Sequence, residues 1–195
     1  MAALITGSIA AAYGPRPWPF ALGIGIALAG LILSVGFVRE THHHAREEAR
    51  HHDERAAERS FRHTFVTTSL RDPSLSAVCQ AGLVNNLNDA LIWGLVPVFL
   101  ASEGLSVGRI GVVAAVYPAS WGLAQLGTGA WSDYVGRKPL IVAGLWLQAL
   151  GIAGLALLDG YGAWIGAALA MGVGTAFVYP TLIAAIGDRA HPAWR

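Results

Sequence analysis

The chain has 195 residues, of which 54% are hydrophobic and only 13% are charged, against roughly 25% charged residues in an ordinary soluble domain. Too few polar side chains remain to cover a water-exposed surface, so most of the chain is expected in lipid. A net charge of +1 gives no general attraction to nucleic acid, and the single cysteine, Cys79, cannot form an internal disulfide. The composition therefore argues against a nucleic-acid-binding protein and against a secreted, disulfide-built one.

Five stretches are long and apolar enough to cross a hydrocarbon core of roughly 30 Å as helices. Residues 1–13 are apolar but too short to span, and no Lys or Arg precedes their apolar run, so we expect the end of a further helix rather than a signal peptide. The predicted fold class is all-α, a polytopic transmembrane helix bundle. The spans are expected at 18–38, 75–101, 110–131, 140–158 and 163–186.

Turn residues and charges set the boundaries and the orientation of these spans. Residues 14–17 turn the chain into the first span, and Asp72 with Pro73 offers an N-cap and a first-turn proline to the second. The positive-inside rule predicts a multi-pass protein of the cytoplasmic (inner) membrane, with the basic segments in the cytoplasm. Those segments carry eleven Lys and Arg residues against two in the opposite turns, and they are 39–73, 132–139 and 187–195.

Residues 39–73 form a charged linker between two membrane parts, 1–38 and 74–195. The linker holds six of the seven histidines, and neutral imidazoles suit zinc, nickel or copper. No Cys lies nearby and no four-ligand geometry follows from the spacing, so we expect a solvated, partly helical linker and keep metal binding as a minor alternative. The histidines are His42, His43, His44, His51, His52 and His63.

A polar and aromatic stripe runs along the second span. Asn85, Asp89 and Trp93 recur every four residues, with Asn88 beside them, and Asp89 is the one acidic residue inside any span. A carboxylate in the bilayer costs roughly 2.5 to 3.5 kcal/mol on insertion scales, so Asp89 should face a cavity or a partner. We expect the stripe to line a substrate pathway, where proton uptake by Asp89 would suit a proton-coupled carrier. Hydrogen bonding that merely joins helices is the alternative.

The third span repeats this pattern with Tyr117, Trp121 and Gln125, and Pro118 offers a kink. The two stripes together could form one wall of an aqueous pathway. Aromatic stripes in membrane helices more often serve packing or interface anchoring, which is the alternative for each ring.

Small residues in the last two spans predict close helix packing, because lipid itself drives no association between helices. Gly172 and Gly174 are followed by Pro180, so the alternative for this pair is a softened helix that moves. The pairs are Gly151 with Gly154, Gly162 with Gly166, and Gly172 with Gly174.

The turn between the third and fourth spans carries the most specific motif. Gly129 can close the incoming helix against a neighbour, Gly136 permits a tight turn, and Asp133 can cap the next helix or pair with Arg137. The pattern resembles the signature loop of the major facilitator superfamily, which is Gly, three residues, Asp, two residues, then Gly-Arg-Arg/Lys. It matches at Gly129, Asp133, Gly136, Arg137 and Lys138, and it departs at Trp131 and Tyr134.

This resemblance implies a twelve-helix secondary transporter. The charged linker, two helices before the loop, implies that the spans correspond to helices six to ten and residues 1–13 to the end of helix five, so that the chain is an internal fragment with a partial transporter fold. By the same resemblance the five matching loop residues control conformational exchange by holding helix ends together. The complete set of these contacts would need helices outside the chain. Tyr179 joins the pathway, whereas Gln148 falls on a peripheral helix and is left out.

We therefore expect a secondary active carrier that moves a small solute by alternating access, with protons as the candidate coupling ion and with the lipid bilayer and the missing helices as partners. No phosphate-binding loop and no nucleophile with a base at recognisable spacing occurs, so neither enzyme activity nor a cofactor is expected. The alternative is a truncated, non-transporting membrane protein, or a scaffold that presents the His-rich loop. The expected pathway residues are Asn85, Asn88, Asp89, Trp93, Tyr117, Trp121, Gln125 and Tyr179.

Overall fold

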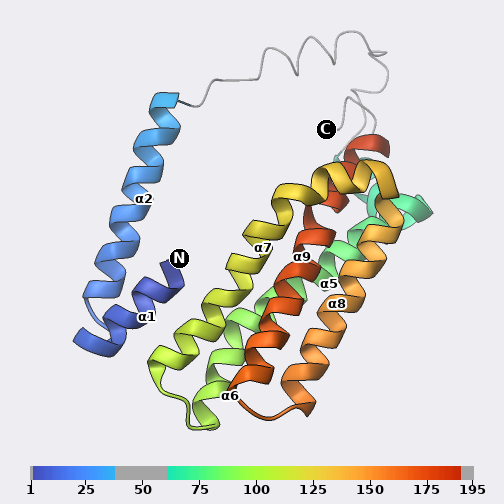
Figure 1. The fold of residues 1–195 in the computed structure, drawn as a ribbon. Helices are drawn as coiled ribbons and strands as arrows, with labels where there is room; N and C mark the ends of the chain where they lie inside the picture. Colours follow the sequence, from blue (N-terminus) through green and yellow to red (C-terminus); the bar gives the residue numbers. More distant parts are fainter. Residues whose placement is uncertain (1, 38–60, 190–195) are drawn as a thin grey trace.

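The computed structural model describes residues 2–37 and 61–189, and all the regular secondary structure in these two ranges is helical (Figure 1). The predicted all-α fold class is therefore confirmed. The helices are α1 (Ala2–Tyr13), α2 (Trp18–Phe37), α4 (Phe61–Val66), the π-helical turn η2 (Thr67–Arg71), α5 (Pro73–Gly94), α6 (Val96–Ser102), α7 (Val107–Val135), α8 (Arg137–Leu157) and α9 (Tyr161–Arg189).

The five predicted spans are all present. Within the described ranges, five helical segments have the length and apolar composition to cross a membrane, and they lie within a few residues of the expected positions. They are Trp18–Phe37, Pro73–Ser102, Val107–Val135, Arg137–Leu157 and Tyr161–Arg189.

The second span begins as its sequence predicts but is broken near its C-terminal end. The Asp72 carboxylate accepts hydrogen bonds from the backbone N–H groups of Ser74 (2.9 Å) and Leu75 (2.8 Å), which caps α5. Leu95 then separates α5 from α6, where one helix was expected. Pro97 explains the break, because proline lacks the backbone N–H of a helix interior and its ring crowds the carbonyl four residues earlier.

The bundle is organised around α9, which packs against α5, α7 and α8. Glycines allow close approaches between these helices: a Cβ atom at Gly172 would overlap the Tyr117 carbonyl oxygen, and one at Gly174 would lie 2.7 Å from the Gly144 carbonyl oxygen. The prediction of close packing is therefore confirmed for α8 and α9. It is wrong, among the described residues, for Gly162 and Gly166, where a Cβ atom would meet nothing within 4 Å.

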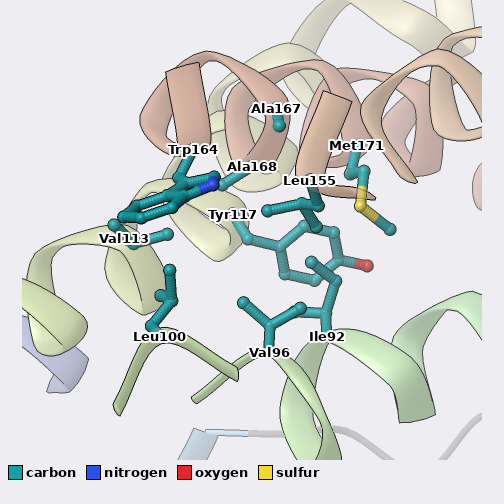
Figure 2. Close-up of a cluster of buried hydrophobic side chains, with 10 residues drawn as sticks. All are labelled: Ile92, Val96, Leu100, Val113, Tyr117, Leu155, Trp164, Ala167, Ala168 and Met171. Carbon is teal, nitrogen blue, oxygen red and sulfur yellow. The ribbon is translucent and has the colours of Figure 1, made fainter. Parts of the chain in front are cut away.

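An apolar cluster fills the half of the bundle nearer the α6–α7 and α8–α9 turns, where side chains from α5 to α9 converge (Figure 2). Tyr117 lies among them and is only 1% exposed. Trp164 makes two further contacts at the edge of this cluster. Its indole N–H donates to the Leu158 carbonyl oxygen (3.1 Å), and its ring meets the Phe99 ring edge to face. The cluster consists of Ile92, Val96, Leu100, Val113, Tyr117, Leu155, Trp164, Ala167, Ala168 and Met171.

The N-terminal helices pack differently. α1 lies against α7, where a Cβ atom at Gly7 would be 3.3 Å from the Gly111 Cα atom. α2 stands apart from the bundle (Figure 1), and none of its residues is buried. A helix with apolar side chains on every face is stable in lipid or against other membrane helices but not in water.

The turns alternate between the two ends of the bundle. The α7–α8 turn and the end of α9 lie at one end, and the α6–α7 and α8–α9 turns lie at the other (Figure 1). This alternation agrees with the predicted order of inner and outer turns. It brings Arg137, Lys138 and Arg189 to the same end of the molecule.

Candidate functional site

The predicted stripe on α5 faces two environments. Asn85 is buried, Asn88 and Asp89 are partly buried, and Trp93 is exposed. The four-residue spacing therefore holds these side chains along one helical face, which passes from the interior of the bundle to its surface. The contacts of each side chain determine which of them can bind a solute or a proton.

A glutamine on α8 is the main correction to the sequence analysis. Gln148, which was left out of the pathway, is fully buried. Its Nε2 donates to the Asn85 Oδ1 (2.7 Å) and to the Thr175 Oγ1 (3.2 Å), and its Oε1 accepts a hydrogen bond from the Asn88 Nδ2. Gln148 thus joins α5, α8 and α9 through one amide group, and Thr175 is a second residue that the sequence analysis missed.

The same network continues to the acidic residue. The Tyr117 hydroxyl donates to the Asp89 Oδ1, and the Tyr117 and Thr175 hydroxyl oxygens lie 3.0 Å apart. Because the phenolic proton is committed to Asp89, the Thr175 hydroxyl is the donor in the second bond. Donors therefore run in one direction from Gln148 through Thr175 and Tyr117 to the carboxylate, and four helices take part.

Aromatic rings form a continuous row beside this network. The Trp93 and Tyr117 ring centroids are 6.0 Å apart, those of Tyr117 and Trp121 are 6.3 Å apart, and those of Trp121 and Tyr179 are 6.0 Å apart. Trp93 and Tyr179 are 50% and 45% exposed, whereas Tyr117 is buried. The structure thus brings together rings from α5, α7 and α9.

Two side chains of the predicted α7 stripe have no hydrogen-bond partner among the described residues. Gln125 is exposed, and no described residue makes a hydrogen bond to its side chain, so the structure does not bring it into the network. The Trp121 indole Nε1 is buried, yet it has no hydrogen-bond partner within the described ranges. An unpaired buried donor is unfavourable by about 1 to 3 kcal/mol, which marks this position as one where a further acceptor would be stabilising.

A sequence signal for Gln148 existed. Gly144, Gln148 and Gly151 lie on one face of α8 at spacings of four and three residues, and two glycines on a membrane helix mark the face where a neighbour approaches closely. A buried amide on that face requires a polar partner on the next helix. No comparable signal marked Thr175, because threonine also occurs at helix interfaces without such a role.

The turn before α8 holds a small charge network. Arg137 pairs with Asp133 (2.7 Å) and with Asp188 at the end of α9 (3.0 Å), and it donates to the Ser132 hydroxyl. The predicted pairing of Asp133 with Arg137 is confirmed, and an acidic partner on α9 was not foreseen. Gly136, with a φ of +93°, makes the tight turn as predicted.

Other details of the loop differ from the prediction. Gly136, rather than Asp133, occupies the position before α8, and no side chain caps that helix. No described residue lies within 4 Å of a Cβ atom placed at Gly129, so the close approach expected there is wrong for the described helices. Lys138 is exposed and makes no ion pair within the described ranges.

The metal alternative concerns residues outside the described ranges. His42, His43, His44, His51 and His52 lie there, and only His63 of the linker histidines is described. In residues 2–37 and 61–189 no group of three or more potential metal ligands occurs.

Comparisons with known proteins return one family. The model of the Major Facilitator Superfamily matches residues 78–195, which contain the α5 stripe, the aromatic row and the Arg137 loop. Neither the search of curated proteins nor the search of solved structures gives a match.

Proposed function

Since the chain belongs to the Major Facilitator Superfamily, we propose that it acts as a secondary active carrier, which moves a small solute by exposing a central site alternately to the two sides of the membrane. Family membership and five membrane-spanning segments make it an integral, multi-pass membrane transport protein. The mechanism, the coupling ion and the orientation in the cytoplasmic membrane belong to the proposal.

The observation that carries the proposal is the placement of Asp89. It is a membrane-embedded carboxylate, it is only partly buried, and one of its oxygens is held by the Tyr117 hydroxyl. A carboxylate used only for helix packing would be enclosed, because exposure to lipid is costly. No described residue makes a hydrogen bond to the second carboxylate oxygen, so that oxygen can take up and release a proton while the hydrogen bond to Tyr117 keeps the side chain in place.

In this proposal the rest of the pathway comes from helices that lie outside the 195 residues. The spans correspond to helices six to ten of a twelve-helix carrier. The unburied helix α2 supports this assignment, since it offers apolar surface for a further helix or for lipid. Carriers of this kind place their substrate site between two helix bundles near the middle of the membrane.

The charge network around Arg137 supplies the gate. Asp133 belongs to the end of α7 and Asp188 to the end of α9, so Arg137 at the start of α8 joins three helix ends at one end of the bundle. Opening the inner side of the bundle would require these ends to separate and the ion pairs to break. Gly129, Asp133, Gly136, Arg137 and Lys138 are therefore proposed as gating residues and not as substrate ligands.

The test is proton-driven flux in membrane vesicles from the source cells, with Asp89→Asn introduced at the chromosomal locus. Asp159→Asn, in the short turn before α9, is the matched control. We expect an imposed pH gradient to drive uptake or release of a solute from a labelled panel, and we expect Asp89→Asn to lower that flux at least tenfold while Asp159→Asn does not. A flux in Asp89→Asn vesicles that still follows the pH gradient would remove this carboxylate from the coupling.

A further inference from the structure

The aromatic row and Asp89 together form a recognisable chemical surface. Trp93, Trp121 and Tyr179 contribute rings from three different helices, and Asp89 lies four residues before Trp93 on the same helix. The Tyr117 ring links Trp93 to Trp121, and its hydroxyl reaches Asp89. A negative charge therefore lies directly beside a row of aromatic rings.

The rings leave surface for a ligand. Trp93 and Tyr179, at the two ends of the row, are 50% and 45% exposed. Trp93 meets Tyr117 at an interplanar angle of 81°, and Tyr179 meets Trp121 at 82°. In an edge-to-face pair the ring that presents its edge keeps both of its faces free of that partner.

The charge of this surface has one sign. Asp89 is the only charged residue between Asp72 and Glu103, and the sequence has no Lys, Arg or His between 110 and 131 or between 161 and 187. The one formal charge that these helices place near the row is therefore negative, which disfavours an anionic solute. The negative face of an aromatic ring adds to this field, because it attracts cations and most strongly those that have lost their water.

We propose that the solute is a lipophilic organic cation, such as a quaternary ammonium or phosphonium compound, whose charge pairs with Asp89 and whose apolar groups lie on Trp93, Trp121 and Tyr179. This inference rests on the proposed carrier function and names its substrate class. A metal ion fits the surface poorly, since hard cations require six or more oxygen ligands and one carboxylate is offered here. A bulky cation needs few oxygens and gains from the rings.

Binding to the full chain tests the assignment. The protein is purified from the source cells with all the helices that its gene encodes and is placed in nanodiscs of zwitterionic phosphatidylcholine. Binding of labelled tetraphenylphosphonium is then measured, with neutral triphenylphosphine oxide as the uncharged competitor. We expect saturable binding that the neutral compound displaces poorly. Asp89→Asn should weaken it more than about tenfold, because close charge pairs contribute at least that much to association.

The aromatic contribution is tested by a matched pair of tryptophans. Trp93→Ala should weaken binding by about 2- to 30-fold, as expected for the loss of one cation–π contact, and Trp93→Phe should restore most of it. Trp146→Ala removes an indole that is 67% exposed on α8, and it should change binding less than twofold. Circular dichroism of each variant separates a loss of fold from a loss of contact.

Three outcomes would overturn the assignment: no saturable binding above empty nanodiscs, equal displacement by the neutral compound, or equal binding by wild type and Asp89→Asn. Proton-driven flux that is lost in Asp89→Asn vesicles, without tetraphenylphosphonium binding by the purified protein, would refute the substrate class and leave the carrier proposal intact. Specific binding of the cation without any proton-driven flux would refute the carrier proposal instead.

Discussion

Replacing Gln148 by leucine should destabilise the bundle far more than the same replacement at an exposed glutamine. Gln148 is fully buried and makes three side-chain hydrogen bonds, to Asn85, Asn88 and Thr175. Leucine has a similar size, so the change removes the polar contacts while leaving the volume nearly unchanged. The substitution therefore measures what the hydrogen bonds contribute to stability, apart from the contribution of side-chain packing.

The magnitude follows from the number of bonds. Side-chain hydrogen bonds between membrane helices are worth about 0.6 kcal/mol on average and about 1.7 kcal/mol at most, so three of them give about 2 kcal/mol, with an upper limit near 5 kcal/mol. Asn85 is only 1% exposed, so water cannot replace its lost partner, and an unsatisfied buried acceptor adds to the cost. We therefore expect a loss of more than about 2 kcal/mol in the free energy of unfolding.

The assay is equilibrium unfolding in mixed micelles, followed by far-ultraviolet circular dichroism during titration with dodecyl sulfate. Gln125→Leu is the control, because the Gln125 side chain is exposed and has no hydrogen bond within the described ranges. Combining Gln148→Leu with Asn85→Leu should give a total smaller than the sum of the single effects, since both remove the same bond. Equal unfolding midpoints for Gln148→Leu and Gln125→Leu would refute the role assigned to this network.

Two further predictions concern packing and the charged turn. Gly174→Ala should lower the free energy of unfolding by about 1 to 3 kcal/mol, because its Cβ atom would lie 2.7 Å from the Gly144 carbonyl oxygen. Gly162→Ala in the same helix should not lower it, because nothing lies within 4 Å of a Cβ atom there. Equal effects of the two substitutions would contradict the packing argument. Arg137→Gln should lower the melting temperature by a few degrees more than Lys138→Gln, since only Arg137 makes ion pairs within the described ranges. That difference should shrink as salt is raised from 0.05 to roughly 0.5 M, because exposed ion pairs are screened, and a difference independent of salt would argue against ion pairing.

Local chemistry explains which features could be predicted without the fold. The spans follow from uncharged length, because a helix is the simplest way to satisfy the backbone in lipid. The Asp72 cap and the Gly136 turn involve neighbours in the chain, so short-range rules suffice for them. The spacing of Asn85, Asp89 and Trp93 placed them on one helical face for the same reason, since residues four apart share a face in any α-helix.

The partners of those side chains depended on the packing of the bundle. Gln148 lies 63 residues from Asn85, and Arg137 lies 51 residues from Asp188, so no local pattern relates them. A polar side chain in a membrane helix signals that a partner is needed, but which helix supplies it depends on the rotation of each helix about its axis. That rotation is set by where glycines let backbones approach, as Gly144 and Gly174 do between α8 and α9. The amino-acid order therefore determined where the helices begin and end, whereas tertiary packing alone decided that Asp89 meets Tyr117, because a hydrogen bond between two helices depends on the position of both.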